Sequence, residues 1–146
     1  MKPATDPILK VAAKALVVDG DGRLLLLRES RAATNSQAGL YGCAGGGLLP
    51  DEDFYTALSR EIKEETGLEV FPIKTLFVGH WRPKILGASY HFVATYIWCH
   101  TDSTQVVLSD EHDHFLWIRP EEYHDLPVMQ PDSQAIDQLI KELRQS

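Results

Sequence analysis

The chain has 146 residues and a net charge of −7, and its contents of apolar and charged residues, 44% and 24%, are ordinary for a globular protein. This length suits one domain with its own core, so we expect a single domain over residues 1–146, with residues 1–7 as a loose tail. The negative charge argues against unaided binding to nucleic acid or to anionic membrane surfaces.

The location of the protein is suggested by three features. The first ten residues, "MKPATDPILK", lack the apolar segment of a signal peptide. No apolar run reaches the ~18 residues that a membrane span requires. Cys43 and Cys99 have no metal-like spacing and are expected to be buried free thiols. The sequence therefore predicts a cytoplasmic protein.

In chain order, the strands come first. The segment "DGDG" at residues 19–22 is typical of a hairpin turn, and "LLLL" beside it is typical of a strand buried on both faces. A short strand is followed by the three glycines of "GLYGCAGGG". Loops are expected over residues 30–39 and most of 101–114. Strands are expected at residues 11–18, 22–29, 70–78 and 89–100, with a short one at 115–118. The segments 70–78 and 89–100 are rich in β-branched and aromatic residues.

Helices are predicted between and after these strands. One covers residues 53–66 and ends at Gly67, and a short one begins at "RPEEY" with Pro120 in its first turn. The last covers residues 131–144, and its buried stripe consists of Ala135, Ile136, Leu139, Ile140 and Leu143. Strands with interspersed helices indicate an α/β fold in which helices pack on the faces of a mixed β-sheet.

The helix over residues 53–66 contains an unusual group of acids. Glu61, Glu64 and Glu65 fall within an arc of about 100° beside the apolar stripe, although like charges at this spacing repel. Arg60 can pair with Glu64, but excess negative charge remains. A solvated acidic face would explain such a run, yet its position against the core favours a bound cation of the Mg²⁺ type.

Glycines precede this helix in "AGGGLLPDED", where they allow backbone to approach a ligand closely or form only a tight turn. Gly46, Glu52, the segment "REIKEE" and Gly67-Leu68 follow one spacing over 23 residues. This spacing resembles the Nudix box of the Nudix hydrolases, GX₅EX₇REUXEEXGU with U apolar, at every specified position.

The resemblance implies an α/β/α sandwich and an enzyme that hydrolyses a nucleoside diphosphate linked to another moiety, with Mg²⁺ or Mn²⁺ as cofactor. It implies metal ligation by Glu61, Glu64, Glu65 and the carbonyl of Gly45. Glu52 resembles a glutamate that assists the metal site, and Arg60 resembles an arginine that orients the glutamates. Ala44, Leu49 and Asp51 depart from common family residues around the box, which leaves the loop geometry open.

A further carboxylate is expected from the loop "LSDEHDH", because the family often supplies one there as a metal ligand or general base. Glu111 resembles it, although Asp110 and Asp113 are also available and an acidic surface loop is the alternative. His112 and His114 lack a second His or Cys pair, so we favour surface or substrate contacts over zinc.

Candidates for substrate binding follow from nucleotide chemistry. Aromatic rings stack on bases, and Tyr41, Phe77 and Trp81 are the candidates, whereas Trp98 and Trp117 are expected in the core. Arg28 is the first candidate for phosphate contact and Arg31 the second, with Arg82 and Lys84 weaker. Each charge could instead be only solvated.

Three functions compete. A metal-dependent pyrophosphohydrolase acting on a nucleotide-type small molecule uses every box residue. A non-catalytic Nudix domain that senses nucleotides or ADP-ribose is opposed by the complete set of glutamates. An acidic interaction module leaves the box spacing unexplained. Nucleoside triphosphates, dinucleoside polyphosphates and nucleotide sugars all remain candidate substrates, with a preference for the first two, and a monomer or a homodimer is expected.

Overall fold

The computed structural model describes residues 6–31 and 37–145. Most of the expected tail and the middle of the expected loop at residues 30–39 lie outside these ranges. The described elements, in chain order, are β1 (Ile8–Val18), β2 (Leu24–Glu29), β3 (Tyr41–Gly42), β4 (Ala44–Gly47), α1 (Phe54–Thr66), β5 (Phe71–Trp81), β6 (Lys84–Ile85), β7 (Ala88–His100), β8 (His112–Ile118), the 3-10 helix η1 (Pro120–Asp125) and α2 (Asp132–Gln145).

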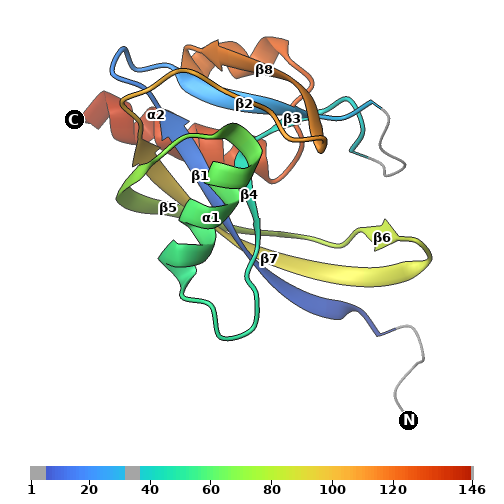
Figure 1. Cartoon of the computed structure of the whole chain (residues 1–146). Helices are drawn as coiled ribbons and strands as arrows, with labels where there is room; N and C mark the ends of the chain where they lie inside the picture. Colours follow the sequence, from blue (N-terminus) through green and yellow to red (C-terminus); the bar gives the residue numbers. More distant parts are fainter. Residues whose placement is uncertain (1–5, 32–36, 146) are drawn as a thin grey trace.

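The sheet is mixed, as the sequence predicts. Its path runs β3-β2-β1-β7-β5, with β4 against β1, β8 against β2 and β6 against β7 (Figure 1). The central pair, β1 and β7, is parallel over the whole of β1, whereas the other named strand pairs are antiparallel. The α/β fold class is therefore confirmed, with a helix on each side of the sheet.

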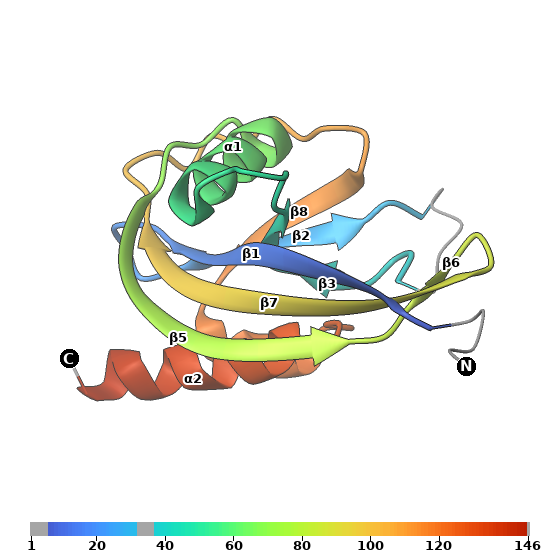
Figure 2. The ribbon, with the colours of Figure 1, turned by 90° about the horizontal axis from the view of Figure 1, so that it is seen from below.

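Two apolar layers explain this arrangement. Alternate residues of a strand face opposite sides of the sheet, so Leu24 and Leu26 pack toward α2 while Leu25 and Leu27 pack toward α1. Leu58 and Ile62 cover the α1 side, and Leu139 of α2 covers the other. Figure 2 shows the sheet between the two helices.

Several expectations differ in detail. All three glycines of "AGGG" form part of strand β4 rather than only a turn, because β4 pairs with β1. The last strand begins at His112, inside the expected loop, because it pairs along β2. Leu143 is half-buried rather than buried. Neither α-helix of the described chain combines the length and apolar character that crossing a bilayer would need.

Candidate active site

Helix α1 is held at both ends by local interactions. The carboxylate of Asp53 accepts hydrogen bonds from the N–H groups of Tyr55 and Thr56, which cap the first turn. Gly67 ends the helix in the left-handed conformation, with φ of 75°, and its N–H donates to the carbonyl of Lys63. Because Ile62 is buried against the sheet, Glu61 and Glu65 are carried toward β4.

Strand β4 needs glycine at two positions beside this helix. Gly45 has φ of 136°, and a Cβ there would lie 2.2 Å from the carbonyl oxygen of Ala13. A Cβ on Gly46 would lie 2.7 Å from the carboxyl carbon of Glu61. The N–H of Gly45 donates to Oε1 of Glu65 at 2.7 Å. The glycines thus let two box carboxylates lie against the backbone.

Arg60 connects three of the box glutamates. Its Nε donates to Glu52 Oε2 at 2.7 Å and its NH2 group to Glu52 Oε1 at 2.9 Å, so this contact is bidentate. Its NH1 group donates to Glu61 at 3.0 Å and, less closely, to Glu64 at 3.4 Å. The expected pairing with Glu64 is present, but Glu52 is the closest partner.

The carboxylate of Glu52 is fixed by these contacts. Hydrogen bonding to Arg60, and then to the N–H of Leu49, lowers the pKa of Glu52 to about 2. Glu52 is therefore ionised throughout the neutral range and keeps Arg60 in place beside Glu61.

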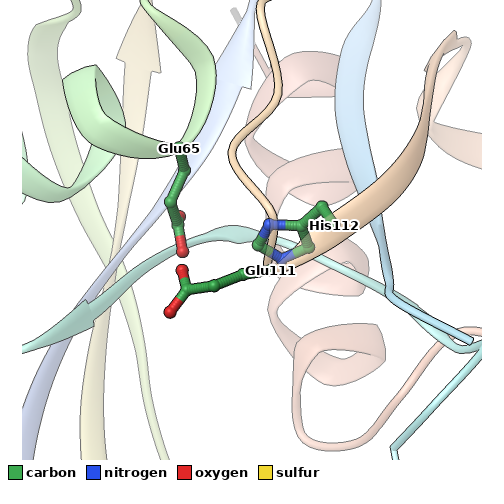
Figure 3. Close-up of side chains that lie close together, drawn as sticks. All are labelled: Glu65, Glu111 and His112. Atoms are coloured by element: carbon green, nitrogen blue, oxygen red, sulfur yellow. The ribbon is translucent and has the colours of Figure 1, made fainter. Parts of the chain in front are cut away.

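A second group of ligand atoms forms where α1 meets the start of β8. Glu65, Glu111 and His112 each offer one ligand atom, and these atoms lie within 4.8 Å of one another. Figure 3 shows the carboxylates of Glu65 and Glu111 directed toward each other, with the His112 ring beside them. The loop is anchored there because the carbonyl of Glu111 accepts from the N–H of Ser30.

The electrostatics of this group favour a cation. Burial, with smaller contributions from Glu111 and Glu61, raises the pKa of Glu65 to about 8, against the lowering effects of the Gly45 N–H and Lys14. Burial also raises the pKa of Glu61 and lowers that of His112 to about 4, which keeps this imidazole neutral. A divalent ion would stabilise the ionised carboxylates that burial disfavours.

The donor set fits such an ion. Carboxylate oxygens dominate it, which suits Mg²⁺ or Mn²⁺, and Nδ1 of His112 is buried without a hydrogen-bond partner among the described residues. Glu61 lies against Gly46, while the Glu64 side chain is 59% exposed at the outer edge. Their metal ligation, and that of the Gly45 carbonyl, stays a prediction.

The predicted substrate residues lie in varied settings. Nε of Arg28 donates to Asp113 at 2.6 Å, and the N–H of Arg31 donates to the same carboxylate at 2.9 Å. Tyr41 is 7% exposed and belongs to the core, which leaves little of its ring for a base.

Trp81 is half-buried and stacks on Phe92, with ring centroids 5.1 Å apart. Trp98 and Trp117, which are expected in the core, are half-buried and pack against it. The roles assigned to these arginines and rings remain predictions.

A small pocket of about 180 Å³ is lined in part by Lys14, a residue for which the sequence predicted no role. Its lining includes Glu65, Glu111 and His112 together with Lys14 and Cys43. Lys14 interrupts the apolar strand "VAAKALVV", and a lysine at a buried position was the available signal. Its partner Asp132, at the start of α2, gave no signal because acids are common at helix starts.

The chain matches the NUDIX domain family over residues 8–139. It is 34% identical over 118 residues to a CTP pyrophosphohydrolase of Escherichia coli (strain K12), covering 81% of this chain and 82% of that protein. It is 28% identical over 100 residues to the nucleoside triphosphatase NudI of Salmonella arizonae, covering 62% of this chain and 70% of that protein.

Solved structures agree with these relatives. A MutT protein from Methanosarcina mazei Go1 superposes with a TM-score of 0.81 at 23% identity, covering 95% of this chain and 98% of that one. The Escherichia coli ORF135 protein superposes with a TM-score of 0.70 at 27% identity, covering 98% of this chain and 96% of that one. With the complete box and the family match over most of its length, the chain belongs to the Nudix family and is a Nudix hydrolase.

Proposed function

We propose that this protein is a divalent-metal-dependent pyrophosphohydrolase that converts nucleoside triphosphates to nucleoside monophosphates and pyrophosphate. The observation that carries the proposal is the convergence of Glu65 and Glu111, from α1 and the β8 loop, in one pocket beside Gly45. The names of the relatives, a CTP pyrophosphohydrolase and a nucleoside triphosphatase, support the substrate class.

Mg²⁺ or Mn²⁺ would be held by Glu61, Glu64, Glu65 and the carbonyl of Gly45, with Glu52 assisting through Arg60. When bound, the metal neutralises charge on the phosphate oxygens and lowers the pKa of a coordinated water. The three glutamates of α1, Glu61, Glu64 and Glu65, supply negative charge at the site. Arg60 fixes the orientation of Glu61 through its 3.0 Å contact.

Glu111 is the proposed general base. Its carboxylate projects from a loop toward Glu65, so it can accept a proton from a water in the same pocket. The water oxygen forms a bond to phosphorus, the anhydride P–O bond breaks, and pyrophosphate leaves with the electron pair of that bond. Glu64, exposed at the edge of the group, is the second candidate for the base.

The other partners are proposed from the same evidence. A small nucleotide is the expected ligand, and neither nucleic acid nor a membrane is expected as a partner. Cys43 and Cys99 are both buried free thiols, which supports a reducing compartment such as the cytoplasm. A sensing role without catalysis is disfavoured because every box glutamate is present.

Turnover of the four ribonucleoside triphosphates with Mg²⁺, with product analysis, tests this function. We expect equal amounts of monophosphate and pyrophosphate, loss of turnover with a chelator, and normal turnover in the control variant Glu121→Gln, which removes an exposed acid in η1. Release of single phosphates, or no turnover of any nucleotide, would refute the proposal.

A further inference from the structure

Lys14 is a charged side chain in an apolar setting. It lies in the middle of β1 between Ala13 and Ala15, which are 0% and 1% exposed, and its own side chain is 12% exposed. Removing an ammonium group from water is costly unless its donors find acceptors. At this position, each of the three N–H donors of Lys14 needs a hydrogen-bond acceptor.

One donor goes to Asp132. Nζ of Lys14 lies 3.2 Å from Oδ2 of Asp132, whose side chain is 2% exposed. The same carboxylate also accepts from the N–H of Cys43, at 2.8 Å, and from the hydroxyl of Tyr96. Asp132 is thus supplied with donors by three different residues, and it would retain two of them without the lysine.

Asp132 lies in close contact with a glycine. A Cβ on Gly42 would lie 2.7 Å from Oδ2 of Asp132 and 2.9 Å from the sulfur of Met129. Any larger residue would displace the carboxylate or the methionine. Gly42 thus lets the Asp132 carboxylate lie close against the backbone of β3, and Gly42, Met129 and Lys14 all line the same pocket.

Asp132 accounts for one of the three donors of Lys14, and Lys14 borders the candidate active site. Lys14 lines the same pocket as Gly45, Glu65 and Glu111. No described residue other than Asp132 accepts a hydrogen bond from Nζ, and the Trp81 ring centroid lies 5.8 Å from it. Among the described residues, the mostly buried ammonium group thus has one hydrogen-bond acceptor for its three donors, and Lys14 lines the pocket that Glu65 and Glu111 also line.

We propose that Lys14 is a substrate-binding residue that donates a hydrogen bond to an acceptor oxygen of the nucleotide, with Asp132 holding the ammonium in place. The strongest acceptor oxygens of a nucleotide are those of the phosphate chain and of the carbonyl groups of the base. The inference rests on the proposed function, because it assigns a contact within the same pocket.

The Lys14–Asp132 pair favours ligand atoms that accept hydrogen bonds. An ammonium group has donors and no acceptor, and Asp132 already accepts from three groups, so a ligand atom at this place meets a donor. A charge-assisted hydrogen bond in a poorly solvated pocket is stronger than one between neutral groups. Its loss should weaken binding by about 10- to 100-fold.

The test is the variant Lys14→Met, which keeps much of the length of the side chain and removes its donors. Binding of non-hydrolysable α,β-methylene analogues of CTP, UTP, GTP and ATP is measured by calorimetry, with KM and kcat for the parent nucleotides. Adenine has no carbonyl oxygen, whereas the other three bases have at least one. Binding of the ATP analogue therefore distinguishes a contact with a base carbonyl, which adenine lacks, from a contact with the phosphate chain.

A loss of about tenfold or more that is confined to CTP, UTP and GTP supports a base contact, and an equal loss for all four supports a phosphate contact. In either case KM should rise more than kcat falls, because the contact is made in the ground state. Affinities within twofold of wild type for all four analogues, in a folded variant, would overturn the inference.

Two controls keep this result interpretable. The double variant Lys14→Met, Asp132→Asn removes both charges, so a defect caused only by leaving Asp132 unpaired is relieved, while a lost substrate contact is not. Thermal melting reports whether each variant is folded. If wild type hydrolyses no nucleotide the proposed function fails, whereas if it is active and Lys14→Met matches it, only this inference fails.

Discussion

Glu65 is buried to 5% exposure at the point where α1, β4 and the β8 loop meet. One of its oxygens accepts from Gly45, and the group also faces Glu111. A single carboxylate here connects the stability of the fold with the chemistry of the site, because ionising it without a cation is unfavourable.

The first prediction concerns pH. The folded-state pKa of Glu65, about 8, lies above its ordinary value of 4.5, so the folded state binds this proton more tightly. The resulting stability is fully present below about pH 4.5 and is lost as the pH rises through about 8. In a chelator, the free energy of unfolding should therefore fall between pH 5 and 8, and it should fall less in Glu65→Gln. An identical decline in both proteins would contradict this origin.

We propose that Arg60 orients the glutamates rather than reacting, because its donors are used by Glu52, Glu61 and Glu64. Arg60→Ala should lower kcat by about 10- to 100-fold, the range typical of residues that hold metal ligands. Arg60→Lys should restore only part of the lost turnover, because a lysine cannot reproduce the bidentate contact with Glu52. Full turnover in the lysine variant would remove this role.

The effect of Glu111 on turnover can be measured separately from the effects of the acids beside it. Glu111→Gln should lower kcat by at least about tenfold, since a general base contributes about 10²–10⁴-fold. Asp110→Asn is the matched control, because Asp110 is exposed in the same loop, whereas Asp113 holds Arg28 and would disturb the loop. If Glu111→Gln keeps full turnover from pH 7 to 9, the base is another group, and Glu64 is examined first.

At the scale of elements, the site depends on how closely β4 approaches α1. Gly46 leaves no room for a Cβ because the carboxyl carbon of Glu61 would lie 2.7 Å away. Gly46→Ala should therefore displace Glu61 and reduce turnover at least about tenfold with little loss of stability, because a polar side chain can move toward solvent. Gly20→Ala is the control, since no atom lies within 4 Å of its added Cβ. Equal turnover in both variants would refute this steric argument.

The sequence predicted these elements well where the signals are local. Helix α1 and its glutamates follow from capping by Asp53 and Gly67 and from 3.6-residue periodicity, which are properties of one segment. Lys14 and Asp132 are 118 residues apart, and Arg28 and Asp113 are 85 apart. Such contacts depend on how β1, β2, β8 and α2 assemble, so no local pattern reveals them. The burial of Tyr41 arises in the same way from packing within the core cluster.

At the scale of the whole molecule, the parallel pair β1 and β7 forms the centre of the sheet, and α1 and α2 lie on opposite sides of it (Figure 2). The candidate site joins the two sides of the sheet. Glu65 comes from α1, Glu111 precedes β8, and Lys14 on β1 contacts Asp132 at the start of α2. Each group that we assign to metal or substrate thus depends on the assembled sheet for its position.

The central claim is that the carboxylates gathered by this fold hold a divalent cation, and thermal melting with and without saturating Mn²⁺ tests it most directly. A ligand that binds only the folded state raises its stability, by about 2.7 kcal/mol at 100 times Kd. Wild type and the control Glu121→Gln should melt several degrees higher with Mn²⁺, and Glu65→Gln should lose most of this increment. An increment of the same size in all three proteins, or none in wild type, would contradict the account.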